Sequence, residues 1–558
     1  MSADDSAAKN GHELREPRLW PVPAAIGLGV VLQAASMWAF AENLSYLVFT
    51  SLFIIWPLSA FLILLWWILW SNLTWEIRGQ GLIGLVVAFL TFVAVFRFDE
   101  FDGAMTPKFS FRWKPTATSK AEQFFKERGS RATPVSKNTV DDSAATETAS
   151  DVVVKTDELS EANSLVPTDE DNPQYLGRNR DGVVVGPPLR TDWDARPPKK
   201  LWRHPIGLGW GSFAAIGRRA WTIEQRGPEE LVVCYDIETG EELWQHSDTA
   251  RFESVQGGNG PRSTPTIHEG QCYALGATGI LNCLDAASGK AIWSRNILDD
   301  AGSTNLPWGQ AGSPLVVDDL VIVAPGSNDD ASKSKYSAVI AYRRDTGEKV
   351  WSSGNRYGSY AAPHLTTLDG ERQVLIFDGV GLSALSVDQG KTLWQFEWTN
   401  TPQINASQPL VIDKNSVLIG SGYGLGSVLL KVTGAMSNWK VQDVWKSKQF
   451  KLKFDSAMRR GDYVYGLDEG LLTCLSLKDG KRVWKQGRYG YGQMLISDDK
   501  LLILSEEGDV VIVPASPEPP RELAKFRAIE GKTWNNPVLA RGRLLVRNAE
   551  EAACYDLK

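Results

Sequence analysis

A ten-residue segment that recurs five times in register constrains the fold of this chain more than any other feature. Each copy has Gly at its sixth position and Trp at its tenth: YDIETGEELW (235–244), LDAASGKAIW (284–293), YRRDTGEKVW (342–351), LSVDQGKTLW (385–394) and LSLKDGKRVW (475–484). Gly supplies the positive φ that a tight turn between two strands needs. Each copy therefore predicts a strand, a turn and a second strand that carries Trp.

Further copies and their spacing predict eight such units. Degenerate copies end at Trp445 and Phe526, and an orphan closing strand ends at Trp202. Successive closing residues are separated by 42, 49, 58, 43, 51, 39 and 42 positions, which suits one four-stranded antiparallel blade each. Innermost strands are expected to begin near residues 212, 263, 312, 361, 407, 456, 492 and 535.

The two ends of the repetitive region are complementary. The chain stops one strand short of a blade, and the orphan strand at 199–202 is the strand that is missing. Closure within one blade removes exposed sheet edges. We therefore expect an all-β, eight-bladed β-propeller of four-stranded antiparallel blades over 173–558, in which the recurring Trp fill the wedges between blades as core residues.

Residues 22–97 have the apolar composition of membrane-spanning segments. Three apolar runs, 22–40, 46–70 and 82–96, approach or exceed the roughly 20 residues that span a bilayer as a helix. A cleaved signal peptide is a poorer interpretation, because the apolar region is too long and repeats. We expect transmembrane helices over 22–97, and Pro57 should kink the second helix without ending it.

Orientation is not decided by charge, since four basic residues flank the spans on each side: Lys9, Arg15, Arg18 and Arg78 against Arg97, Lys108, Arg112 and Lys114. Large domains translocate largely regardless of charge. We expect residues 1–21 to form a cytoplasmic tail. The propeller would then face the periplasm or the outside of a bacterial inner (cytoplasmic) membrane.

Between the spans and the repeats the composition changes again. Residues 98–172 include long polar, acidic stretches with few aromatics, which bury too little apolar surface to offset the entropy of ordering. We expect a flexible acidic linker there, with at most an incidental short helix around 119–128.

Charge and cysteine content exclude several function classes. The net charge of −7 offers no basic footprint for DNA or RNA. Four of the five Cys occupy the same repeat position in different blades and the fifth, Cys272, is diagonal to Cys283, so five free, structural thiols are expected. No CxxC or HExxH spacing supports a metal site, and no Cys-x-x-Cys-His pattern supports a haem.

The repeat closely resembles the tryptophan-docking repeat of the pyrroloquinoline-quinone (PQQ) propeller superfamily. Segments such as YLGRNRDGV and GKTWNNPVLARGRLLVRNAEEAACYDL look like bacterial PQQ-like repeat proteins of the BamB-like kind. The resemblance covers about residue 175 to the end. It implies the propeller fold, and it implies either a scaffold without cofactor, as in BamB-like proteins, or a PQQ-dependent dehydrogenase.

Polar and aromatic side chains cluster where the inner strands are predicted to begin. PQQ would need cations for its carboxylates and aromatic faces for its ring. A solvated propeller channel is lined by polar groups in any case. The channel-lining candidates for cofactor binding are Glu224, Gln225, Arg262, Asn405, Lys453 and Trp534, within a wider set of Trp210, Arg226, Asn259, Gln310, Tyr360, Gln408, Asp455, Gln493 and Asn535.

Two functions remain open at this point. The resemblance to alcohol-oxidising quinoproteins would imply a Ca²⁺ ligand set and a vicinal Cys pair, and the pair is absent. We therefore favour a membrane-anchored, extracytoplasmic propeller that binds envelope proteins or other partners at its rim, without catalysis, metal or cofactor. The alternative is a PQQ-dependent membrane-bound dehydrogenase that oxidises an alcohol or sugar. Asp455 would be its candidate base, although we favour Asp455 as a salt-bridge partner of Lys453 or Arg459.

Overall fold

The computed structural model describes residues 20–39, 44–129, 165–328, 336–434 and 438–558. The chain divides into two compact units, Met1–Lys114 and Pro115–Lys558. The predicted tail at 1–21 lies almost wholly outside the described residues.

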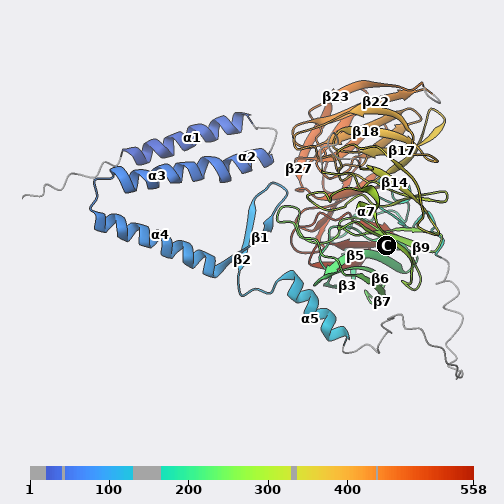
Figure 1. Ribbon diagram of the computed structural model, residues 1–558, viewed down its shortest axis with the longest axis horizontal. Helices are drawn as coiled ribbons and strands as arrows, with labels where there is room; N and C mark the ends of the chain where they lie inside the picture. The colour runs from blue at the N-terminus through green and yellow to red at the C-terminus, as the bar shows by residue number, and fades with distance from the viewer. Residues whose placement is uncertain (1–19, 40–43, 130–164, 329–335, 435–437) are drawn as a thin grey trace, which may run out of the picture. The chain divides into compact units, whose positions relative to one another are not determined.

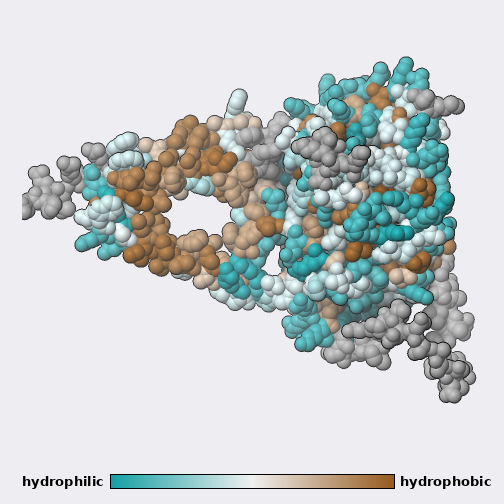
Figure 2. Space-filling model, viewed as in Figure 1, coloured by the Kyte–Doolittle hydropathy of each residue, from teal (hydrophilic) through white to brown (hydrophobic). Residues whose placement is uncertain are grey.

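The first unit contains the three predicted apolar helices (Figure 1). They are long and apolar enough to cross a bilayer, and Figure 2 shows hydrophobic residues gathered on them. The second is continuous through a π-helical turn that precedes Pro57, so this proline does not end it. The elements are α1 (Pro21–Ala39), α2 (Leu44–Thr50), η1 (Ser51–Ile55), α3 (Trp56–Trp70) and α4 (Trp75–Val95).

The third helix begins earlier than the apolar run predicted. It starts at Trp75 rather than near residue 82, because Thr74 caps it: the Thr74 hydroxyl accepts a hydrogen bond from the Ile77 N–H at 3.4 Å. Glu76 in the first turn adds a favourable charge at the helix N-terminus. Polarity near residue 75 therefore marks a helix start and not a loop.

Much of the predicted linker is folded. A hairpin of β1 (Phe96–Phe101) and β2 (Pro107–Phe111) follows α4 directly, and α5 (Ala117–Gly129) opens the second unit. The expectation of a flexible segment over 98–172 was wrong for these residues, because local aromatic clusters are diluted in a composition averaged over the whole stretch. Residues 130–164 lie outside the described residues.

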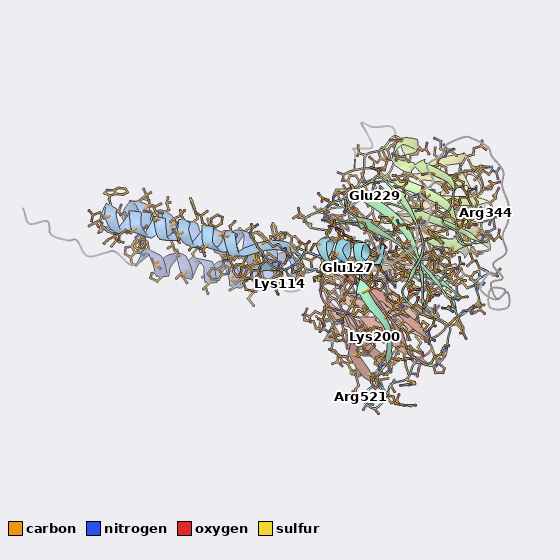
Figure 3. All side chains as sticks on the ribbon, turned by 90° about the horizontal axis from the view of Figure 1, so that it is seen from below. Lys114, Glu127, Lys200, Glu229, Arg344 and Arg521 are labelled. Atoms are coloured by element: carbon orange, nitrogen blue, oxygen red, sulfur yellow. The ribbon has the colours of Figure 1, made fainter. Side chains whose placement is uncertain are left out.

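Helix α5 is a docked part of the propeller unit and not an incidental turn. The Phe124 ring stacks on His204 with centroids 4.9 Å apart, and the Arg226 guanidinium lies 3.4 Å from the Phe125 ring centroid. At the far end of the helix Arg128 donates to the Gly240 carbonyl at 3.2 Å. Figure 3 labels Glu127 on α5 and Lys200 on β3, the strand that α5 contacts.

The second unit is an eight-bladed propeller, as predicted. Each blade is a four-stranded antiparallel sheet. The first four blades comprise β4 (Ala214–Ile216), β5 (Arg219–Arg226), β6 (Glu229–Asp236) and β7 (Glu242–Asp248); β8 (Thr266–His268), β9 (Gln271–Leu275), β10 (Ile280–Asp285) and β11 (Ala291–Asn296), followed by the short helix α7 (Ile297–Ala301); β12 (Leu315–Val317), β13 (Leu320–Val323), β14 (Val339–Arg343) and β15 (Lys349–Ser353); and β16 (His364–Leu368), β17 (Glu371–Phe377), β18 (Gly381–Ser386) and β19 (Thr392–Glu397).

The remaining blades complete the ring, and the last one is closed by both ends of the repetitive region. Trp202 on β3 pairs with Cys554 on β34, so the orphan strand supplies the missing outer strand. These blades comprise β20 (Leu410–Asp413), β21 (Ser416–Ser421), β22 (Gly426–Thr433) and β23 (Lys440–Ser447); β24 (Met458–Arg460), β25 (Tyr463–Asp468), β26 (Leu471–Ser476) and β27 (Arg482–Arg488); β28 (Gln493–Ser497), β29 (Lys500–Leu504), β30 (Asp509–Pro514) and β31 (Ala524–Arg527); and β32 (Val538–Ala540), β33 (Arg543–Arg547) and β34 (Glu551–Asp556) with β3 (Lys199–Pro205).

The recurring Trp dock each blade onto the next. Trp244 of the first blade covers Gly289 in the turn of the second, where a Cβ atom would lie 2.4 Å from the ring, and its indole N–H donates to the Ala286 carbonyl at 3.1 Å. Trp293 repeats this arrangement on Gly347. The same contact to a turn glycine is made by Trp202, Trp351 and Trp445.

The docking pattern has an exception in the fourth blade. The Trp394 indole N–H donates to the Gln373 side chain of its own blade at 2.6 Å. The next turn in the chain belongs to a degenerate repeat that lacks the Gly-x-x-x-Trp ending. The indole therefore has a partner even where the neighbouring turn does not supply one.

All five Cys are buried and form no disulfide, as expected. Cys283 pairs with Tyr273, and Cys272 pairs with Leu284, which is the predicted diagonal register. Cys234 faces the docking Trp244 across a strand pair, and three other Cys repeat this position. These thiols are small core groups beside the docking rings.

Two glycines of the second blade allow the stability cost of disturbing Trp docking to be measured apart from the cost of backbone strain. Gly289 (φ 74°) lies under Trp244, whereas Gly270 (φ 76°) has open space where a Cβ would stand. Gly270→Ala should cost about 1–2 kcal/mol of unfolding free energy for the left-handed backbone alone. Gly289→Ala should cost a further ~1–3 kcal/mol, because the methyl group displaces the ring. Chemical denaturation of both variants measures this difference, and equal losses would contradict the docking role.

Candidate functional site

A segment of the chain that precedes the repeats fills the axial space of the propeller. We call residues 171–184 the plug segment. Asn172 exchanges backbone hydrogen bonds with Ala215 of the first inner strand, at 2.9 and 2.6 Å. Ile267 of the second inner strand donates to the Pro173 carbonyl at 2.8 Å. Ile496 of the seventh inner strand pairs with Gly182 and Val184, both at 2.9 Å, so the plug segment closes the inner edges of three blades.

Arg180 anchors the plug segment in the propeller core. Its side chain is 2% exposed, and its guanidinium donates to the Pro363 carbonyl at 2.8 Å, to the Ser313 carbonyl at 3.2 Å and to the Pro314 carbonyl. Burial lowers the pKa of this guanidinium to about 9, with the nearby Tyr175 opposing the shift. Arg180 thus joins the inner strands of the third and fourth blades by hydrogen bonds to main-chain oxygens.

Tyr175 links the plug segment to the opposite side of the ring. Burial raises the pKa of its hydroxyl, and the nearby side chains of Ser456 and Asn536 oppose that shift. Nearby Asp455 is 2% exposed and accepts the Leu467 N–H at 2.7 Å. Burial, with the charge of Asp468, raises the Asp455 pKa to about 7.

The polar groups at the starts of the inner strands bind neighbouring blades to one another. The Ser212 N–H donates to the Thr264 hydroxyl at 3.0 Å, and the Thr264 N–H donates to the Ser313 hydroxyl at 2.9 Å, which joins three successive blades. Further links of this kind come from Gln408 to Ser456, Gln493 to Phe454 and Asn535 to Gly211. The predicted polar cluster is therefore a structural ring of hydrogen bonds.

Glu224 and Gln225 belong to the edge where α5 docks. Glu224 is fully buried; burial raises its pKa, but Arg226 and Arg547 outweigh this and hold the pKa below its usual range. It accepts from the Tyr235 hydroxyl at 2.7 Å and from Arg226 at 2.8 Å. The Gln225 side-chain oxygen accepts the Phe252 N–H at 2.8 Å. Both side chains stabilise the first blade.

Arg262 and Asn405 are also engaged by their own surroundings. The Arg262 guanidinium donates to the carbonyls of Gly257, Gly258 and Gly260 at 2.5–3.0 Å, and burial lowers its pKa to about 10. Fully buried Asn405 donates to the Asp378 and Trp398 carbonyls at 2.7 and 3.1 Å. These contacts fold local loops over the start of an inner strand.

Lys453 and Trp534, by contrast, lie in one cluster of aromatic and cationic groups. The Trp534 ring centroid is 5.1 Å from that of Trp210 and 5.2 Å from that of Phe454. The Lys453 ammonium lies 4.7 Å from the Tyr491 ring centroid, and Phe454 contacts the same Tyr491 at 5.7 Å. Of the six candidates, these two are the ones that the structure brings together.

Further aromatic residues lie in loops before other inner strands and in the loop between β21 and β22. A second pair, Trp308 and Tyr360, has centroids 5.3 Å apart, and Lys453 also lies 5.6 Å from the Tyr423 ring. Lys532, which is 5% exposed, lies 4.1 Å from the Trp534 ring centroid. We define the aromatic collar as Trp210, Trp308, Tyr360, Tyr423, Phe454, Tyr491 and Trp534, together with Lys453 and Lys532.

The collar has rigid support and suits recognition more than catalysis. The Trp534 indole N–H donates to Glu506 at 2.8 Å, and the Tyr491 hydroxyl donates to Glu469 at 2.7 Å. Most collar residues precede inner strands, and Tyr423 lies in the loop between β21 and β22, whereas the backbone of the plug segment pairs with Ala215, Ile267 and Ile496 inside inner strands. The collar therefore forms the mouth of the axial space, and the plug segment fills that space farther along the axis. Aromatic faces and cations suit contact with a partner's side chains.

The residues at the axis do not fit a resident quinone. Arg262, the predicted cation for a quinone carboxylate, donates three hydrogen bonds to carbonyls of its own loop. The Asn405 side-chain amide donates to two carbonyls. Arg180 and Tyr175 of the plug segment occupy the axis itself. Over the described ranges, no group of three or more His, Cys, Asp or Glu is placed to hold a metal ion.

Sequence reasoning missed Arg180, Tyr175, Lys532, Phe454 and Tyr491. The signal for the first two was the segment YLGRNRDGV, in which two glycines flank a short stretch that contains Arg178 and Arg180. Gly177 and Gly182 both adopt positive φ, 81° and 73°, and turn the chain on either side of Arg180. The collar residues outside the repeat carried no periodic signal.

Comparison with known proteins agrees with this fold. Residues 228–486 match the family model described as outer membrane protein assembly factor BamB. The BamB protein of Yersinia pestis is 22% identical over 390 residues, which cover 60% of this chain and 93% of that protein. The BamB protein of Burkholderia pseudomallei is 23% identical over 321 residues, covering 55% of this chain and 74% of that protein.

A solved structure adds a second branch with the same fold. Quinohemoprotein alcohol dehydrogenase from Comamonas testosteroni superposes with a TM-score of 0.50 at 12% identity, covering 72% of this chain and 82% of that one. At this identity the likeness concerns the fold alone. With its docking Trp and its eight closed blades, the propeller of this chain is similar to the PQQ-like β-propeller repeat proteins that include BamB, and three long apolar helices precede it in the sequence.

Proposed function

We propose that this protein is a membrane-anchored, extracytoplasmic binding module that holds an envelope protein at its aromatic collar. The observation that carries the proposal is that the axial space of the propeller has a filled interior and a partly exposed mouth. The plug segment fills the interior, whereas the collar presents partly exposed rings such as Trp308 and Trp534, together with the partly exposed Lys453, at the mouth. The three apolar helices support the anchor. The relatives named as outer membrane protein assembly factors support a partner in the cell envelope.

The chemistry of the collar favours a polypeptide partner. Trp, Tyr and cationic side chains in a well-supported cluster are the residues that dominate binding energy at protein interfaces. Trp210 and Trp534 contact each other, and the Lys532 ammonium contacts both rings, so little side-chain entropy is lost on binding. The alternative of a PQQ-dependent dehydrogenase lacks comparable support, because Arg262 and Asn405 are committed to local carbonyls.

Site-specific photo-crosslinking in the native envelope tests the collar. A photoreactive phenylalanine analogue replaces Trp308 or Tyr423 in the collar, and Leu243 or Val483, which are 45% and 43% exposed on outer strands, serve as controls. Both collar positions should crosslink to the same envelope protein, identified by mass spectrometry, and the outer positions should not.

Crosslinks from the outer strands alone would place the partner elsewhere and contradict the proposal. A parallel titration with PQQ and Ca²⁺ distinguishes the alternative. Saturable absorbance changes that Arg262→Ala abolishes would favour the dehydrogenase over the binding module.

Arg180 offers a test of the plug segment. Arg180→Gln should lower the unfolding free energy by about 3 kcal/mol, because several buried carbonyls lose their donor. The matched control is Arg178→Gln, an exposed neighbour whose loss should cost less than about 0.5 kcal/mol. Thermal or urea unfolding measures both. Crosslinking from the collar should survive at temperatures where Arg180→Gln is folded; its loss there would show that the plug segment takes part in binding.

Asp455 provides a pH-dependent test of the same interior. Its pKa is about 7 in the folded protein against 3.8 for the free side chain, so the folded state keeps a proton that the unfolded state releases. The contribution of Asp455 to stability therefore falls as pH rises from about 4 to 7 and stays low above 7. Asp455→Asn should raise the melting temperature at pH 8 by several degrees, with a smaller gain at pH 5. An equal effect at both pH values would mean that this carboxyl does not titrate in the fold.

A further inference from the structure

The hairpin that follows α4 has two chemically different faces. Phe96 pairs with Phe111, and Phe98 pairs with Phe109, so these four rings share one face of the two strands. After a bulge, Phe101 pairs with Pro107 on that same face. The opposite face carries Arg97, Asp99, Glu100, Lys108 and Ser110. The two strands are thus fully amphipathic.

The aromatic face is exposed to an unusual degree. Phe98 is 40% exposed, Phe109 48% and Phe111 38%, and Trp113, stacked on Phe111 at 4.7 Å, is 69% exposed. A two-stranded hairpin is at best marginally stable in water. A contiguous exposed aromatic patch of this kind marks a surface that meets another apolar phase.

The hairpin is fixed at the end of the third apolar helix. Helix α4 ends at Val95 and β1 begins at Phe96, with no residue between them. Arg112 donates its backbone N–H to the Val95 carbonyl at 2.9 Å and its side-chain Nε to the Val93 carbonyl at 2.6 Å, which satisfies carbonyls of the last helical turn. The strands therefore cannot move away from the boundary at which the apolar span ends.

The hairpin also folds back along the helices. Phe109 contacts Phe92 of α4 with centroids 5.4 Å apart. Phe101 contacts Phe53 at 6.1 Å, and Phe53 lies six residues inside the second apolar span, which begins at Leu47. Figure 1 shows β1 and β2 extending beside the end of α2. One edge of the aromatic face is thus level with residues that would lie in lipid.

We propose that β1–β2 is an interfacial hairpin that binds the surface of the lipid bilayer. Its aromatic face enters the boundary of the acyl chains, where Trp and other aromatic rings partition favourably. Its charged face, with exposed Lys108 and the neighbouring exposed Arg112 and Lys114, meets the phosphates of the head groups. This inference rests on the proposed membrane anchor and adds a lipid-binding surface to it.

Strand alternation gives a sharp test with matched positions. The full chain is reconstituted in nanodiscs of phosphatidylcholine and phosphatidylglycerol, and single cysteines labelled with the environment-sensitive fluorophore NBD replace Phe109 or Phe111 on one face, and Lys108 or Ser110 on the other. The five native thiols are buried, and the unmodified chain measures their background labelling. Leu85→Cys, 58% exposed in the middle of α4, reports on the anchor.

Lipid contact should appear with a period of two residues. At positions 109 and 111, NBD emission should shift to the blue and lose intensity when lipids with a nitroxide near the head group are included, whereas positions 108 and 110 should report water. If position 85 is quenched but all four hairpin positions show the emission of a water-exposed fluorophore, the hairpin does not bind lipid, and the membrane anchor still holds. Blue-shifted emission at 109 without lipid quenching would mean that protein covers the face, which also overturns the proposal. Position 85 is tested with lipids that carry the nitroxide near the end of the acyl chain, because the middle of α4 would lie about 15 Å from the head groups. Failure of quenching there would refute both the anchor and the hairpin.

Discussion

The propeller depends on one repeated contact, in which an indole ring on the outer strand of a blade lies on a glycine in the turn of the next blade. The glycine has positive φ and no Cβ, so the ring can approach to van der Waals contact, as Trp244 does over Gly289. The indole N–H then satisfies a turn carbonyl that the strands leave unpaired. Around the ring these contacts set the wedge between blades, and the outer strand β3 closes the circle.

A closed ring leaves an axial space, and the chain's own residues decide what that space does. Arg180 bridges carbonyls of two blades from inside, and Tyr175 reaches Ser456 on the far side. The buried carbonyls of these blades depend on Arg180 as their hydrogen-bond donor, so they would lose this donor if the plug segment left the axis. The interior is therefore core, and recognition is left to the collar at its mouth, where rings such as Trp308 are partly exposed.

The sequence predicted the propeller well and the region before it less well, for a physical reason. Each copy of the repeat encodes the same packing arrangement, so the copies at 284–293 and 342–351 support the same structural prediction. A single docked element such as α5 has no second copy, and Phe124 and Phe125 stood out only once His204 and Arg226 were seen beside them. Glu224 and Asn405 were predicted to line the channel as cofactor-binding candidates. In the structure Glu224 accepts a hydrogen bond from the Tyr235 hydroxyl and Asn405 donates to the Asp378 carbonyl, and such partners are not visible in a sequence.

What the sequence determined by itself is therefore what periodicity and composition encode: the number of blades, the closing strand that ends at Trp202, the buried thiols and three apolar helices. What only the tertiary structure decided is which of the predicted polar and aromatic groups lie in one cluster. Lys453 and Trp534 meet in the collar, while Arg262 turns back to its own loop. Local patterns follow from strand and helix geometry, but partners distant in sequence are chosen by the closure of the ring, since only closure brings the first and last blades and the plug segment to one axis.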